Sequence, residues 1–115
     1  MEYINEHGQL HRLDGPAYVS RNGTKEWYQN DLLHRVDGPA IEHKNGHRAW
    51  YQNGLPHRLD GPAAIYSDGG HDWFIYGEEV TVEVNQWLKE QNITLPMSES
   101  ELTMFILKFA GRSND

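Results

Sequence analysis

The chain has 115 residues, of which 37% are apolar and 23% are charged, a composition typical of one small globular domain. Seventeen acidic residues outnumber ten basic ones and give a net charge of −7. Because nucleic-acid binding depends on neutralising phosphates, an acidic chain without a basic run is not expected to bind nucleic acid. The sequence has no cysteine and no apolar run near the ~20 residues of a bilayer span, which excludes disulfides, thiolate chemistry and a transmembrane helix.

One heptapeptide recurs three times at a constant interval of 23 residues. The copies read His-Arg-Leu-Asp-Gly-Pro-Ala from His11, His-Arg-Val-Asp-Gly-Pro-Ala from His34 and His-Arg-Leu-Asp-Gly-Pro-Ala from His57. A glycine and a tryptophan recur at the same interval, as Gly23, Gly46 and Gly69 and as Trp27, Trp50 and Trp73. Self-similarity at a fixed period indicates a repeat architecture, here of three units over residues 8–30, 31–53 and 54–76.

Each unit carries two turn signals. Asn-Gly or Asp-Gly dipeptides at residues 22–23, 45–46 and 68–69 favour two-residue hairpin turns with positive φ. The predicted strand pairs are 16–21 with 24–29, 39–44 with 47–52, and 62–67 with 70–75. A second reversal follows at residues 30–31, 53–54 and 76–77. We therefore expect a mainly β fold, an antiparallel β-hairpin repeat array over residues 1–77.

The Asp-Gly-Pro-Ala step and the aromatic pairs predict how the units stack. Gly is expected to adopt a conformation closed to other residues, and Pro fixes φ where the next strand begins. Each Arg of the repeat lies two residues before an Asp, which predicts a structural Arg/Asp ladder. Because neighbouring strand residues point to opposite faces, the tryptophans are expected on one face and Tyr28, Tyr51 and Phe74 on the other.

Residues 78–115 change to a helical period and are predicted to form a cap of two helices. Thr81 is expected to cap a helix over residues 82–91, and Ser98 with Glu101 forms a capping box for a second helix that ends before Gly111. Leu102, Phe105, Ile106 and Phe109 supply its apolar stripe. Because an open repeat array needs its end covered, we expect a cap. The alternative is that part of the stripe forms a homodimer or partner surface.

The period, the glycine-punctuated hairpins and the stacked aromatics together resemble MORN repeats. The wording Trp-Tyr-x-Asn-Gly followed by His-Arg-x-Asp-Gly-Pro-Ala is similar to a MORN-like variant of tailed phages and large DNA viruses, over about residues 8–77. The resemblance implies an elongated, curved antiparallel sheet used for binding or assembly, in a viral context. The usual MORN His-Gly-x-Gly step is replaced here, so the lipid association proposed for MORN proteins does not carry over.

Histidines and carboxylates are the candidates for chemistry. His11, His34 and His57 share one repeat position, and equivalent atoms of neighbouring units lie ~10 Å apart, too far for one metal ion. We expect each to be a hydrogen-bonded structural residue. His43, His47 and His71 lie near the hairpin tips, where the sequence leaves metal binding open. A hydrolase needs different residues at unequal positions, whereas these recur threefold, so we expect no enzyme and no cofactor.

Binding is the function that the repeat favours. The exposed member of each aromatic pair, beside an arginine, would form a strip on which a peptide, a strand or a flat ring stacks. The alternative is that the helices cover one aromatic ladder and the other only packs along the sheet. The candidate binding residues are Trp27, Trp50, Trp73, Tyr28, Tyr51, Phe74, Arg12, Arg35 and Arg58.

Three functions from different classes follow. The first is a small phage-type protein-interaction module that binds and modulates a host protein, as an anti-defence inhibitor. The second is a protein that sequesters a small ligand such as a nucleotide, and the third is a structural protein that self-assembles as a homo-oligomer through its C-terminal helix. The N-terminal residues lack a secretory signal pattern, so we expect a cytoplasmic protein, of the host cell if phage-encoded, without a membrane partner.

Overall fold

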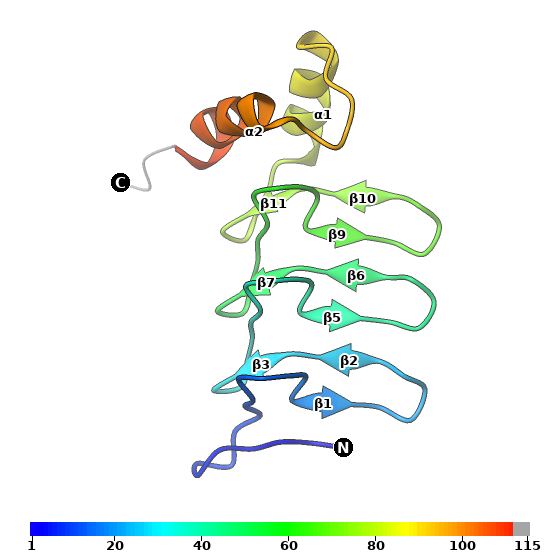
Figure 1. The fold of residues 1–115 in the computed structure, drawn as a ribbon, viewed down its shortest axis with the longest axis vertical. Coiled ribbons are helices and arrows are strands. Elements are labelled where there is room, and N and C mark those ends of the chain that lie inside the picture. The colour runs from blue at the N-terminus through cyan, green and yellow to red at the C-terminus, as the bar shows by residue number, and fades with distance from the viewer. Residues whose placement is uncertain (112–115) are drawn as a thin grey trace.

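A computed structural model describes residues 1–111 and shows a ladder of stacked β-hairpins with helices at one end (Figure 1). The molecule is elongated, with extents of 48 × 36 × 22 Å. Six strands form one antiparallel sheet in the order β1-β2-β5-β6-β9-β10, so each repeat adds one hairpin to the sheet. The predicted fold class, an antiparallel β-hairpin repeat array with two C-terminal helices, is confirmed.

Every strand is two residues long. The sheet strands are β1 (Tyr18–Val19), β2 (Lys25–Glu26), β5 (Ile41–Glu42), β6 (Arg48–Ala49), β9 (Ala64–Ile65) and β10 (His71–Asp72). The other strands pair as three side hairpins, β3 (Tyr28–Gln29) with β4 (Leu32–Leu33), β7 (Tyr51–Gln52) with β8 (Leu55–Pro56), and β11 (Phe74–Ile75) with β12 (Glu78–Glu79). The last pairing carries the array two residues past the predicted boundary at Gly77.

The long hairpins differ from the prediction at their tips. The backbone N–H of Ser20 donates to the carbonyl of Thr24, and the N–H of Gly23 donates to the carbonyl of Ser20. The loop is therefore three residues long, and only its glycine has positive φ, at 90°. Three-residue hairpin loops commonly consist of a type I turn followed by one residue in the left-handed conformation, and this loop has that form. The predicted two-residue loop was wrong, whereas the predicted need for glycine is confirmed here and at Gly46 and Gly69.

The side hairpins contain the two-residue turns. Both turn residues have positive φ in each, at 51° and 67° for Asn30 and Asp31, and at 52° and 80° for Asn53 and Gly54. Positive φ at both central residues defines the type I′ turn, whose twist matches that of paired strands. The second reversal of each unit is thus a hairpin of its own.

The predicted second strand of each unit is broken at its tryptophan. Trp27 lies between β2 and β3, and its backbone N–H donates to the carbonyl of Ala40 in the next unit. Ala40 is fully buried, and its own N–H donates to the carbonyl of Ala49. The chain leaves the main sheet at this point to form the side hairpin. Each tryptophan consequently stands at the corner between the sheet and a side hairpin.

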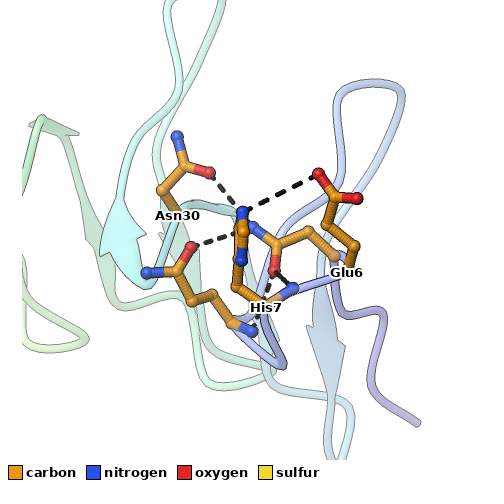
Figure 2. Close-up of polar contacts among 5 residues, drawn as sticks. Glu6, His7 and Asn30 are labelled. Carbon is orange, nitrogen blue, oxygen red and sulfur yellow. Dashed lines mark hydrogen bonds and ion pairs between the residues drawn. The ribbon is translucent and has the colours of Figure 1, made fainter.

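The first eleven residues form a half unit that the repeat motif does not reveal. Tyr3 makes the backbone contacts of a repeat tryptophan, because its N–H donates to the carbonyl of Ala17 and its carbonyl accepts from the N–H of His11. The Asn5 side chain donates to Asn30 at 3.1 Å, beside a 3.7 Å contact of Glu6 with His7 (Figure 2). The array therefore starts before the first recognisable repeat.

The helical cap is α1 (Thr81–Glu90), α2 (Glu99–Phe105) and a π-helical continuation, η1 (Ile106–Ala110). The Ser98–Glu101 capping box is confirmed, and the helical segment ends before Gly111 as predicted. The predicted N-cap at Thr81 was wrong: α1 follows Val80 without a side-chain cap, and Thr81 is its first residue. The hydroxyl of Thr81 instead accepts the N–H of Trp73, at 2.9 Å.

The largest apolar core lies between the last repeat and the helices. It comprises Trp73, Ile75, Val80, Val84, Trp87, Phe105 and Phe109. Phe105 of α2 packs on Trp73 with ring centroids 5.2 Å apart, and both side chains are fully buried. The helices therefore cover the end of the array, while Met104 and Leu107 stay exposed on the outer side of the stripe.

Candidate functional site

The arginine of each repeat makes three contacts that recur in all three copies, and Arg35 also pairs with Glu42 at 3.0 Å. Arg35 stacks on the ring of Trp27 in the preceding unit with the guanidinium carbon 3.9 Å from the centroid. Its Nε donates to Asp37 at 2.9 Å, and its Nη1 donates to the carbonyl of Pro39 at 3.0 Å. Arg12 makes the same contacts with Tyr3, Asp14 and Pro16, and Arg58 makes them with Trp50, Asp60 and Pro62. The predicted Arg/Asp ladder is confirmed, and it joins each unit to the one before.

The glycine of the Asp-Gly-Pro step makes room for this arginine. A Cβ on Gly38 would lie 2.9 Å from the guanidinium carbon of Arg35, and the equivalent distances at Gly15 and Gly61 are 2.9 and 2.8 Å. None of the three has positive φ. The predicted conformational role of this glycine was therefore wrong; a Cβ here would instead meet the guanidinium, which would have to move from its place.

The histidine of each repeat is structural, as predicted. Nδ1 of His34 accepts the backbone N–H of Asn53, at 3.0 Å, from the next side hairpin. His11 accepts from Asn30 and His57 accepts from Tyr76 in the same way. His57 also stacks on the Tyr76 ring with centroids 4.0 Å apart, and burial lowers the pKa of His57 below its ordinary value of 6.5. These contacts need a neutral imidazole whose Nδ1 carries no proton.

Two successive grooves lie between the heptapeptide loops and share Arg35 and Val36. The first encloses about 550 Å³ and is lined by Arg12, Leu13, Asp14, Gly15, Trp27, Gln29, His34, Arg35, Val36 and Asp37. The second encloses about 210 Å³ and is lined by Arg35, Val36, Trp50, Gln52, His57, Arg58, Leu59 and Asp60. We call this surface the loop-face groove.

Aliphatic side chains project along the loop-face groove. Leu13 and Val36, the variable third residue of the heptapeptide, are 76% and 77% exposed. Leu59 at the same position of the third copy instead packs against the helical core. Sequence reasoning missed these residues because it followed the invariant positions of the repeat. The available signal was that the variable position is aliphatic in all three copies.

Within residues 1–111, the helices cover the corner of the third repeat that corresponds to the open grooves. Trp73 stands where Trp27 and Trp50 stand, and it is fully buried under Phe105. Ile75 and Val80 replace the Gln and His that line the open grooves, and both are buried. Trp73 therefore offers no surface to a ligand in this structure, and its Nε1 finds no hydrogen-bond partner within residues 1–111.

The other aromatic ladder lies on the opposite face. Tyr51 and Phe74 line a groove of about 240 Å³ together with Ala49 and Ala64, and no tryptophan is among its lining residues. Tyr28 donates its hydroxyl to Glu26 at 2.8 Å, and burial together with this contact raises the pKa of Tyr28 to about 12. The predicted separation of the two ladders agrees with these linings. Tyr28 stays a protonated donor, which does not suit a phenolate nucleophile.

The hairpin-tip histidines are only partly brought together. The rings of His43 and His47 meet edge to face with centroids 5.0 Å apart. The pKa of His47 is lowered, mainly by desolvation and to a smaller extent by the charge of His43. Nδ1 of His71 instead lies 3.3 Å from the carbonyl of Gly69 in its own loop. No group of three or more His, Asp or Glu side chains within residues 1–111 is placed to hold a metal ion.

Comparisons with known proteins identify no relative of this chain, so its fold is what describes it best. No protein-family model, no curated protein and no solved structure matches this chain. Across residues 1–111, every helix is too short or too polar to cross a bilayer. What the structure defines is an antiparallel β-hairpin repeat protein with a helical cap. Its resemblance to MORN-like repeats stays a prediction from sequence.

Proposed function

We propose that this chain is a protein-interaction module that binds its partner on the loop-face groove. The observation that carries the proposal is the row of exposed aliphatic side chains at Leu13 and Val36, which continues into the packed Leu59. Burying these aliphatic side chains under a partner would remove apolar surface from water, which favours binding. Their recurrence at one repeat position gives the partner a regular surface to recognise.

The arginine contacts favour a polypeptide partner over a nucleotide. Each guanidinium already stacks on an aromatic ring, pairs with an aspartate and donates to a proline carbonyl. A phosphate would have to compete with these contacts. The tryptophans and arginines of the groove are therefore assigned as its rigid floor, and the aliphatic residues as its contact points.

The partner's class follows from the resemblance and the charge. The MORN-like variant of phages suggests a host protein as partner and inhibition of a defence protein as outcome. The net charge of −7 favours a partner with a basic surface. A pull-down identifies the partner, and an assay of the captured protein with and without the bound chain then tests for inhibition.

The test is a quantitative pull-down from bacterial lysate with three forms of the full chain. The first is intact, the second carries Leu13→Asp with Val36→Asp, and the third carries Leu107→Asp, a matched control because Leu107 is 71% exposed on the cap. We expect one protein to be captured by the intact and control forms and depleted about tenfold or more with the double variant, a loss of about 1.4 kcal/mol. Equal capture by all three forms, or by none, contradicts the proposal.

A further inference from the structure

We infer that the occupant of the loop-face groove is an amphipathic α-helix of the partner with basic residues beside its apolar stripe. This inference rests on the proposed function and names the partner's binding element. Three observations support it: how the chain fills its own third groove, the spacing of the repeats and the row of exposed aspartates.

The chain itself places a helix at the end of this surface. The position after Trp73 corresponds to the open grooves after Trp27 and Trp50, and Phe105 and Phe109 of the helical segment belong to the core there. Leu59 takes part in both places, because it lines the second open groove and packs against the helical core. A helix bound on Leu13 and Val36 would reach Leu59 at the edge of this helical core, although α2 itself lies across the ladder rather than along it (Figure 1).

The spacing of the grooves matches a helix that runs along the ladder. Each repeat adds two strands to the sheet, so equivalent side chains in neighbouring units stand about 10 Å apart. Two turns of α-helix, or seven residues, rise about 10.5 Å. Apolar residues at heptad spacing therefore meet successive aliphatic positions, with one side chain entering between Leu13 and Val36 and the next between Val36 and Leu59.

The rim of the groove sets the charge of the partner helix. The side chains of Asp14, Asp37 and Asp60 are 88%, 86% and 68% exposed. Each accepts its arginine Nε through Oδ1, and Oδ2 makes no hydrogen bond or ion pair within residues 1–111. Although each aspartate is paired with an arginine, its exposed second oxygen is an acceptor at the repeat spacing, which favours Lys or Arg on the side of the helix that faces this row.

Two displayed peptide libraries of about 21 residues, or three heptads, test the occupant. The first fixes apolar residues at positions a and d of each heptad and randomises the others. The second fixes the same number of apolar residues at alternating positions of one continuous stretch, as in a strand, and randomises the others. Both are selected on the intact full chain and counter-selected on the Leu13→Asp, Val36→Asp variant.

We expect specific binders from the heptad library alone, enriched in Lys and Arg, that weaken about tenfold or more on the double variant and bind the Leu107→Asp control unchanged. Specific binders from the alternating library alone, or heptad binders insensitive to the double variant, would overturn the helix. The pull-down result separates the two levels: if a captured protein depends on Leu13 and Val36 but no heptad binder emerges, the interaction module stands and the helix falls.

Discussion

The first two full repeats and the third share one backbone arrangement but differ in what covers their tryptophans. At Trp27 and Trp50 the ring is covered by an arginine of the next unit, at 3.9 and 3.8 Å. At Trp73 the position of that arginine is taken by Thr81, and the ring is covered by Phe105. The first two copies leave polar, open grooves, whereas the third forms an apolar core.

This difference shows which contacts each repeat takes from the unit that follows it. Each tryptophan corner needs an acceptor for its backbone N–H and a cover for its ring. Within the array the next unit supplies both, through an alanine carbonyl and an arginine. At the end of the array the acceptor is the Thr81 hydroxyl and the cover is Phe105. The cap therefore replaces the missing fourth unit contact by contact.

Removing the aromatic cover of the third unit should have the largest effect. Phe105→Ala is expected to lower the free energy of unfolding by about 3 to 5 kcal/mol, because Phe105 is fully buried against Trp73 and Trp87. Chemical denaturation measures the loss. Leu107→Ala, on the exposed side of the same segment, should change it by less than about 0.5 kcal/mol. Similar effects of the two variants would mean that the segment does not cap the array.

Removing the substitute acceptor should have the next largest effect. Thr81→Ala leaves the Trp73 N–H without its 2.9 Å partner and is expected to cost about 2 kcal/mol. Thr81→Ser keeps the hydroxyl and should recover most of the loss in the same thermal or chemical unfolding experiment. If Ser and Ala destabilise equally, the methyl group of Thr81, rather than its hydroxyl, contributes the stability.

The arginine cover of the open units can be displaced through its glycine. Gly38→Ala places a Cβ 2.9 Å from the Arg35 guanidinium carbon and should push it off Trp27, at a cost of about 1 to 2 kcal/mol. In an Arg35→Ala background the same glycine substitution should be nearly neutral, because nothing is left to displace. A double-mutant cycle of unfolding free energies measures this coupling. Additive losses would show that the glycine acts through its own backbone.

Much of this fold could be predicted because its local signals repeat. The positive φ of the turn glycines, the Arg/Asp pairs of the heptapeptides and the Ser98–Glu101 box were identified correctly from sequence. The loop length at the hairpin tips and the role of the heptapeptide glycine were not. The half unit at Tyr3 was missed because it lacks the heptapeptide and holds one more residue between its aromatic and His11 than Trp27 has before His34. Its equivalence rests on backbone hydrogen bonds, which leave little trace in side-chain identity.

The sequence predicted many of the residues that form the candidate site, but not what each of them does there. The sequence predicted an arginine beside the exposed member of each aromatic pair but left open which ladder is exposed. It also could not show that Arg35 and Arg58 each already stack on a tryptophan ring. That contact depends on packing between units, as does the burial of Trp73 under Phe105. The exposed Leu13 and Val36 were overlooked because a variable aliphatic position resembles ordinary core filling until its exposure is known.

The smallest expected effect is a pH dependence at the junction of the second open groove with the cap. His57 is 4% exposed, its Nδ1 accepts the Tyr76 N–H at 2.8 Å, and burial lowers its pKa below 6.5. The unfolded chain, with an ordinary histidine, takes up this proton first as the pH falls. Stability from His57 is therefore complete above pH 6.5 and is lost below it, toward the lowered pKa of the folded state.

Melting temperatures between about pH 8 and pH 5 should fall more steeply for the intact chain than for His57→Gln, because glutamine does not titrate. Parallel curves would mean that the folded state accommodates a protonated His57, in which case its contact with Tyr76 does not require the neutral ring.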